Sequence, residues 1–319
     1  MKRRVFNAAV LAATALSSLR AWADESPPFE TLEFDWADAK RQRAVPVRLY
    51  WPNAASAQVP LVVFSHGIGG SRRGYSYLGQ HWASNGIASL HLQHVGSDRS
   101  LWFGSPFGLV GRLQDAAQER EAIERPRDLR FALDQLMASP LGERIDRKHI
   151  VAAGHSYGAN TTLLAAGARI ERAGKAVDLH DERLCAAVVL SAPPFYGERE
   201  PARILGPVQL PTLHVTATGD VIRIPGYWSG AEDRIAVFEA VGSKRKALAV
   251  FEGGSHSMFT DRPGTGGVEL NPRVKLATKE LSLAFLQASF GTGSPLALSQ
   301  WALRYREIIA KHDGAFGTA

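Results

Sequence analysis

Short apolar runs alternate with helical segments from residue 61 almost to the end of the chain. Runs of this kind are typical of strands buried on both faces of a parallel sheet. The alternation therefore predicts an α/β fold, with a mostly parallel central sheet and helices on both of its faces. The expected strands are 61–64, 87–92, 149–153, 186–190, 213–216 and 247–251, and the expected helices are 77–85, 116–138, 160–168, 235–241, 273–290 and 301–309.

The segments around this alternation complete the expected layout. Residues 31–50 hold two stretches with strand character, and a long loop, 96–111, follows the strand at 87–92. The helix at 116–138 contains an internal proline, Pro126. Because no linker rich in Pro, Gly and Ser divides the chain, we expect a single domain over residues 24–319.

The first 23 residues read as a secretory signal peptide. Basic residues at 2–4 precede an apolar stretch at 8–19, and Ala21-Trp22-Ala23 offers small residues for cleavage after Ala23. The protein is therefore expected to be exported, either periplasmic or secreted. Arg3-Arg4-Val5-Phe6 also resembles a twin-arginine signal, which Arg20 near the cleavage site suits, so both export routes stay open.

The charge of the chain depends strongly on this segment. The whole sequence has 37 Lys and Arg against 31 Asp and Glu. Removal of residues 1–23 leaves 33 basic residues and a net charge of +2. The composition gives no reason to expect nucleic acid or an anionic membrane as a partner. After residue 20, no apolar stretch is long enough to span a bilayer. Cys185 is the only cysteine, which excludes an internal disulfide, and it is expected within a buried strand.

The pentapeptide Gly154-His155-Ser156-Tyr157-Gly158 matches G-x-S-x-G between a predicted strand and a predicted helix. In the α/β-hydrolase fold this motif is the nucleophile elbow, a tight turn that exposes the serine oxygen above the sheet edge. Side chains two positions on either side would collide, which explains the glycines. Ser156 is therefore the candidate nucleophile. The alternative is a glycine-rich turn without catalytic function.

An acyl-transfer site also needs N–H donors for the oxyanion, each worth roughly 3–4 kcal/mol. The amide of Tyr157, directly after the nucleophile, is one candidate, because the helix dipole at that end favours negative charge. The second donor is expected in the glycine-rich loop 66–70, where the amide of Ile68 is the candidate. His66 in this loop is expected to support the turn rather than to react.

The base is expected after the nucleophile, because the triad of this fold runs Ser, then Asp or Glu, then His along the chain. His256 follows the last predicted strand in a short loop, at the strand end where open α/β sheets form their sites. The other downstream histidines are less suitable: His180 lies in a polar insertion, His214 within a strand and His312 in the tail.

Asp220 is the candidate acid, since it follows the strand at 213–216 in the turn Thr218-Gly219-Asp220. An acid at this place would hold the tautomer of the imidazole and stabilise the imidazolium. Asp233 and Glu252 are the alternatives. His91 and His94 are three residues apart, but no third ligand is evident, so the sequence predicts neither a metal site nor a cofactor.

Two aromatic groups are candidates for lining the substrate site. Trp102 and Phe103 belong to the loop 96–111, and Phe195 and Tyr196 follow the strand after the elbow. If both groups overhang Ser156, they enclose an apolar pocket that favours short acyl groups, of about two to six carbons. The alternative is that the first group packs on the neighbouring helix.

Several motifs together resemble the platelet-activating factor acetylhydrolase family, which lies within the wider dienelactone-hydrolase-like group. The resemblance covers most of residues 45–290. It implies an α/β-hydrolase fold and hydrolysis through a serine nucleophile. The segments that carry it are 62–67, Tyr75, Leu78, 83–86, 98–100, 154–159 and 254–259.

The sequence departs from this pattern in two places. Plasma acetylhydrolases place the acid near the position of Ser191, where this chain has no acid, and Asp220 lies one strand later, as in cutinases and polyester hydrolases. The tryptophan that cutinase-like enzymes carry near Pro194 is missing. Dienelactone hydrolases proper use a cysteine nucleophile. The resemblance therefore implies the mechanism but leaves the substrate open.

The expected function is hydrolysis of small-molecule carboxylic esters through an acyl-enzyme, with a Ser156–Asp220–His256 triad. Amide or peptide hydrolysis on the same triad is one alternative. A non-catalytic binding protein is another, because a fold does not by itself establish a function.

Overall fold

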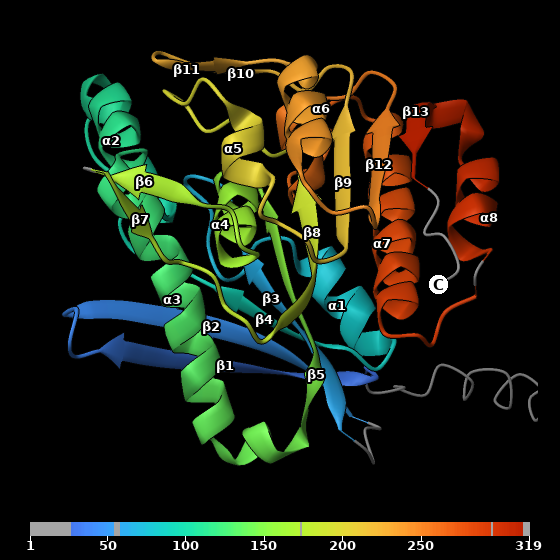
Figure 1. Cartoon of the computed structure of the whole chain (residues 1–319), viewed down its shortest axis with the longest axis horizontal. Coiled ribbons are helices and arrows are strands. Elements are labelled where there is room, and N and C mark those ends of the chain that lie inside the picture. The colour runs from blue at the N-terminus through green and yellow to red at the C-terminus, as the bar shows by residue number, and fades with distance from the viewer. Residues whose placement is uncertain (1–26, 54–57, 173, 295, 315–319) are drawn as a thin grey trace, which may run out of the picture.

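A nine-stranded sheet runs through the protein, with helices on both faces (Figure 1). The computed structural model describes residues 27–53, 58–172, 174–294 and 296–314. The sheet order is β1-β2-β4-β3-β5-β8-β9-β12-β13, in which β2 is antiparallel to both neighbours and β13 is antiparallel to β12. The strands are β1 (Phe29–Asp38), β2 (Arg43–Pro52), β3 (Val59–Ser65), β4 (Ala88–Leu92), β5 (Ile145–His155), β8 (Leu184–Leu190), β9 (Thr212–Ala217), β12 (Lys246–Phe251) and β13 (Ile309–Asp313).

Alternate side chains of each central strand pack into opposite layers, as the pleat of a strand requires. Val62 and Phe64 of β3 pack in the layer that contains α1, α7 and α8. Leu61 and Val63 point the other way, towards α3, and the same face continues under α4, α5 and α6. The helices are α1 (Ser76–Ser84), α2 (Leu109–Ala116), α3 (Glu119–Ala138), α4 (Tyr157–Ala165), α5 (Pro201–Leu205), α6 (Ala231–Ala240), α7 (Leu270–Ser289) and α8 (Ala297–Arg304).

The predicted α/β-hydrolase fold is thus confirmed, and each expected central strand is present with bounds shifted by a few residues. Two expected helices differ in their bounds. The helix predicted at 116–138 is α3, which begins at Glu119, and Ala116 is the last residue of a separate helix, α2, that the sequence did not predict. Gln118 has an extended ψ of 149°, which ends one helix axis and starts another. The helix predicted at 301–309 is α8, which ends at Arg304. The predicted loop 96–111 contains two 3₁₀ turns and the start of α2.

The sheet also extends beyond its predicted last strand. After α8, residues Ile309–Asp313 form β13, which pairs with β12 and covers that edge. Two small hairpins lie outside the sheet: β6 (Ile170–Arg172) with β7 (Lys175–Val177), and β10 (Ile222–Ile224) with β11 (Tyr227–Ser229). Edge strands and hairpins this short have too few alternating apolar residues to stand out in a sequence.

The export signal lies outside the described residues and stays a prediction, as does the single domain over 24–319. Among the helices that the structure describes, none is long and apolar enough to cross a membrane. Cys185 lies in β8, where burial raises the pKa of its thiol to about 11, so the thiol stays protonated at neutral pH.

Candidate active site

Ser156 occupies a strained turn between β5 and α4. Its backbone angles are φ 55° and ψ −122°, which a residue with a side chain rarely adopts. The glycines of the pentapeptide make this turn possible: a methyl group on Gly158 would collide with the carbonyl oxygen of Ser65, and one on Gly154 with that of Gly158. The turn therefore needs glycine at both positions, as the pattern predicted.

The imidazole of His256 contacts this serine from the segment after β12. His256 begins a 3₁₀ turn, η4 (His256–Phe259), in the segment that follows β12. Its Nε2 lies 2.7 Å from Ser156 Oγ, and its Nδ1 lies 2.7 Å from Asp220 Oδ1. Ser156, His256 and Asp220, proposed together from the sequence, are thus in one line of contacts. The sequence alternatives Asp233 and Glu252 have other partners, Gly230 N and Thr218 Oγ1.

Asp220 is fully buried, and its surroundings hold it ionised. Thr216 Oγ1 donates to its Oδ2 at 2.8 Å, and Arg234 Nη2 lies 3.4 Å from its Oδ1. Burial acts to raise the pKa of Asp220, but the hydrogen bond with His256 and the charges of His256 and Arg234 outweigh it. The pKa therefore lies well below its usual range. A buried carboxylate in this state orients the imidazole that it contacts.

The loop after β3 lies against the elbow and carries the predicted amide of Ile68. The amides on both sides of Ile68 are already engaged: Gly67 N–H donates to Tyr75 Oη at 3.3 Å, and Gly69 N–H donates to Ser97 O at 2.8 Å. Ile68 itself lines the same cavity as Ser156 and His256. Tyr157, the other predicted donor, is the first residue of α4, where amides have no partner within the helix.

Arg125 links this loop to α4, the helix that follows the nucleophile. It lies on α3 with no exposed surface, and it donates to the carbonyl oxygen of His66. It also donates to Thr161 Oγ1 of α4 at 2.9 Å and to Ser97 Oγ at 2.7 Å, and its guanidinium lies 4.5 Å from the ring centroid of Tyr157. Burial lowers the pKa of Arg125 to about 10, which leaves it charged at neutral pH.

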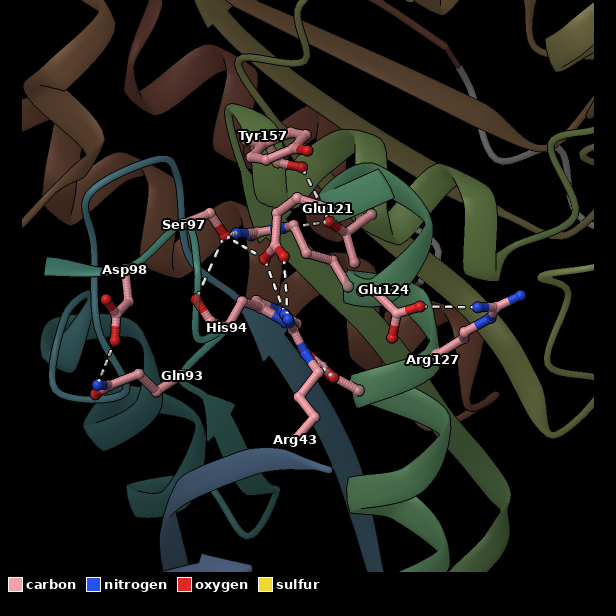
Figure 2. Close-up of polar contacts among 12 residues, drawn as sticks. Arg43, Gln93, His94, Ser97, Asp98, Glu121, Glu124, Arg127 and Tyr157 are labelled. Carbon is pink, nitrogen blue, oxygen red and sulfur yellow. Dashed lines mark hydrogen bonds and ion pairs between the residues drawn. The ribbon is translucent and has the colours of Figure 1, made fainter. Parts of the chain in front are cut away.

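Arg125 belongs to a larger cluster of polar and charged side chains, of which Figure 2 labels Arg43, His94, Ser97 and Glu121. Arg43 of β2 binds Glu121 at 2.9 Å and Asp128 at 2.8 Å, both on α3. Asp128 in turn accepts from His94 Nδ1 at 3.0 Å, and the Nε2 of His94 faces Ser65 Oγ at 3.0 Å. Polar groups removed from water are costly unless paired, and here the pairs link α3, β2 and the loop that carries Ile68. This part of the site is therefore held by many mutual contacts.

These supporting residues were missed in the sequence, although a signal exists. Glu121, Arg125 and Asp128 recur at i, i+4 and i+7, so they share one face of α3. A charged stripe on a helix is ordinarily solvated, and only the placement of β2 and of the loop after β4 buries this one. His66 and His94 belong to the same hydrogen-bonded set. Among the described residues, no group of three His, Cys, Asp or Glu side chains is arranged to hold a metal ion.

A cavity of about 460 Å³ opens beside Ser156. Phe195 and Tyr196, two of the predicted lining residues, contribute to its wall. Trp102 and Phe103 are not among the residues that line it. Trp102 is 45% exposed and donates from Nε1 to the carbonyl oxygen of Gly69 at 2.7 Å. Further lining residues come from α2 and from the β10–β11 hairpin: Leu113, Ile222, Ile224 and Tyr227.

Known proteins resemble this chain in sequence and in structure. The family described as "Platelet-activating factor acetylhydrolase, isoform II" matches residues 38–104. A platelet-activating factor acetylhydrolase of Cavia porcellus is 24% identical over 152 residues, which are 37% of this chain and 34% of that protein. The match thus spans about a third of the relative.

Two solved structures share the fold. A ferulic acid esterase from Streptomyces cinnamoneus superposes with a TM-score of 0.63 at 22% identity, covering 87% of this chain and 94% of that one. A cold-adapted esterase from an Arctic intertidal metagenomic library gives 0.53 at 18% identity, covering 79% and 96%. On this evidence, the chain has the fold of these esterases and resembles platelet-activating factor acetylhydrolases over part of its sequence.

Proposed function

We propose that this protein is a carboxylic ester hydrolase with Ser156 as nucleophile, His256 as general base and Asp220 as the acid that orients the base. The observation that supports this most is the pair of 2.7 Å contacts that joins the three side chains at the edge of the cavity. Such contacts, with a nucleophile next to a base and a base oriented by a third group, define the triad by geometry rather than by sequence position.

The reaction proceeds in two halves. His256 Nε2 takes the proton of Ser156 Oγ as the oxygen attacks the ester carbonyl, and the amides of Ile68 and Tyr157 donate to the resulting oxyanion. The tetrahedral intermediate collapses, and His256 returns the proton to the alcohol that leaves. Water then attacks the acyl-enzyme with the same base, which releases the acid and regenerates Ser156. The ionised Asp220 stabilises the imidazolium in both halves.

The finer proposal is a preference for short acyl groups, of about two to six carbons. Phe195 and Tyr196 line the same cavity as Ser156. In this proposal they bound the acyl part of the ester, and the rest of the cavity takes the alcohol part. Each further methylene is worth about 0.8 kcal/mol until it meets a wall. A panel of p-nitrophenyl esters of rising chain length tests this preference. A maximum at twelve or more carbons contradicts it.

The Ser156→Ala variant tests the chemistry. We expect kcat to fall by about 10⁶-fold on p-nitrophenyl esters, with the unfolding transition preserved. Matching p-nitroanilides are expected to react far more slowly than the esters with the wild-type protein. Residual ester hydrolysis within about tenfold of wild type would exclude Ser156 as the nucleophile.

A further inference from the structure

Three buried groups form a chain of hydrogen bonds between the two loops of the site. Gly67 N–H donates to Tyr75 Oη at 3.3 Å, and Tyr75 Oη lies 2.8 Å from His155 Nδ1. His155 Nε2 lies 2.9 Å from the carbonyl oxygen of His256. One end of the chain is thus the residue before Ile68, and the other is the backbone of the base. Neither Tyr75 nor His155 takes part in the proposed reaction.

The chemistry of the groups gives this chain a single direction. The carbonyl oxygen of His256 only accepts, so His155 Nε2 must carry a hydrogen. Burial, and next the charge of His256, lower the pKa of His155 to about 3, so its imidazole is neutral and its Nδ1 bears no hydrogen. Tyr75 therefore donates to Nδ1, and its oxygen remains free to accept from Gly67. Every donor in the chain meets an acceptor.

The backbone of Tyr75 is unusual in a way that fits this role. It has φ 58° and ψ 31°, the left-handed region, which is rare for a bulky aromatic residue. Its ring packs 4.7 Å from the ring of Phe64, and the residue is 4% exposed. Such a conformation persists only where the surroundings determine it, and strained residues of this kind gather at functional sites. In this conformation, the Tyr75 hydroxyl lies between the amide of Gly67 and the imidazole of His155.

We propose that Tyr75 and His155 are positioning residues. Through this chain of hydrogen bonds they keep the amide of Ile68 and the imidazole of His256 at a fixed distance from each other. The proposal rests on the proposed ester hydrolysis. An oxyanion donor and a base act on the same intermediate, so their relative position matters more than the stability of either loop. A displacement of about 1 Å in such a site costs on the order of 10²-fold in rate.

Tyr75→Phe removes one oxygen from this chain and leaves the ring in place. We expect kcat to fall by about 10- to 100-fold, with KM changed by less than about twofold, because the loss affects the transition state more than substrate binding. A trifluoromethyl ketone forms a hemiketal with Ser156 whose oxyanion uses the same amides. Its affinity is expected to fall by the same factor as kcat/KM.

Tyr77→Phe is the matched control. Tyr77 lies in α1, for which Tyr75 is the N-cap residue. Its hydroxyl donates at 3.1 Å to the carbonyl oxygen of Phe259, a residue of the same turn as His256. It makes no bond to the oxyanion loop among the described contacts. We expect Tyr77→Phe to change kcat by less than about threefold. Equal losses of kcat in the two variants, or no loss in Tyr75→Phe, overturn the proposal.

Nitrogen NMR of histidine-labelled protein tests the chain without relying on catalysis. Wild-type His155 is expected to stay neutral and protonated on Nε2 between about pH 5 and pH 8. Tyr75→Phe should shift the Nδ1 resonance, and Tyr77→Phe should not. A His155 that titrates in this range, or that carries its hydrogen on Nδ1, overturns the chain whatever the protein hydrolyses. Ester hydrolysis that survives in Ser156→Ala would instead refute the proposed function.

Discussion

The residues around the cavity fall into two groups that differ in how firmly they are held. The inner group comprises Ser156, His256, Asp220 and the loop 66–70; most of it is buried, His256 and residues 68–70 are partly buried, and Arg125 of α3 bonds both this loop and α4. The outer group comprises α2, residues 193–198 and the β10–β11 hairpin. In α2 only Ala116 is buried, and β10 and β11 pair only with each other.

The two groups match the two tasks of a hydrolase, which are catalysis and recognition of the substrate. Segments with few buried apolar contacts open at low free energy, whereas buried, mutually bonded groups keep one geometry. The inner group has the properties that the chemistry needs, since oxyanion donors and a base must stay in place. The outer group has the properties of a surface that adapts to the substrate. We therefore expect variants of the inner group to change kcat, and variants of the outer group to change specificity.

The largest effect is expected for Asp220→Asn in the inner group. The amide cannot hold the catalytic tautomer of His256, so kcat should fall by about 10⁴-fold on p-nitrophenyl butyrate. Asp233→Asn is the control, because this carboxylate accepts from Gly230 N–H at the start of α6 and does not contact His256. If Asp233→Asn or Glu252→Gln lowers kcat more than Asp220→Asn does, Asp220 is not the acid.

Acid should destabilise the protein through buried histidines. Burial lowers the pKa of His91, His155 and His214 to about 3, whereas imidazoles in the unfolded chain titrate near 6.5. Below that pH the unfolded state takes up protons that the folded state cannot, so the free energy of unfolding falls as pH falls. The loss between pH 7 and pH 5 is about 2 kcal/mol for each of these groups.

Urea unfolding at the two pH values measures this loss. His214 lies on β9 outside the inner group, with its ring 5.4 Å from that of Phe238. His214→Leu should therefore lose about 2 kcal/mol less than wild type between pH 7 and pH 5, while kcat at neutral pH is retained. An unchanged pH dependence in this variant would mean that His214 is protonated in the folded state.

The smallest effect is expected in the outer group, on specificity. Tyr196 lines the cavity and bonds through Oη to Ser229 Oγ at 2.8 Å and to Tyr227 O at 3.0 Å. Tyr196→Ala should raise kcat/KM for longer acyl groups by roughly fourfold for each methylene that gains room. Trp102→Ala should leave the chain-length profile unchanged, because Trp102 does not line the cavity. The opposite ranking of the two variants would contradict the division into inner and outer groups.

The contrast between the two groups also explains what the sequence could predict. Ser156 and its glycines follow from local sterics, and His256 and Asp220 follow from the order of strands whose ends meet at one sheet edge. The partners of Arg125 and Tyr75 are distant in sequence: Arg125 bonds His66, 59 residues away, and Tyr75 bonds His155, 80 residues away. No local pattern encodes such pairs. The position of Trp102 was still harder to predict, because apolar side chains in a loop do not reveal which surface they cover.

Labelling with a fluorophosphonate, followed by mass spectrometry of the digested protein, tests the central claim most directly. The reagent phosphonylates a serine only where a base and an oxyanion site act on it together. We predict one adduct per chain, on the peptide that contains Ser156, and none in the Ser156→Ala variant or after heat denaturation. Folded protein that stays unlabelled, or that carries its adduct on another serine such as Ser65 or Ser255, would contradict the assignment of the active site.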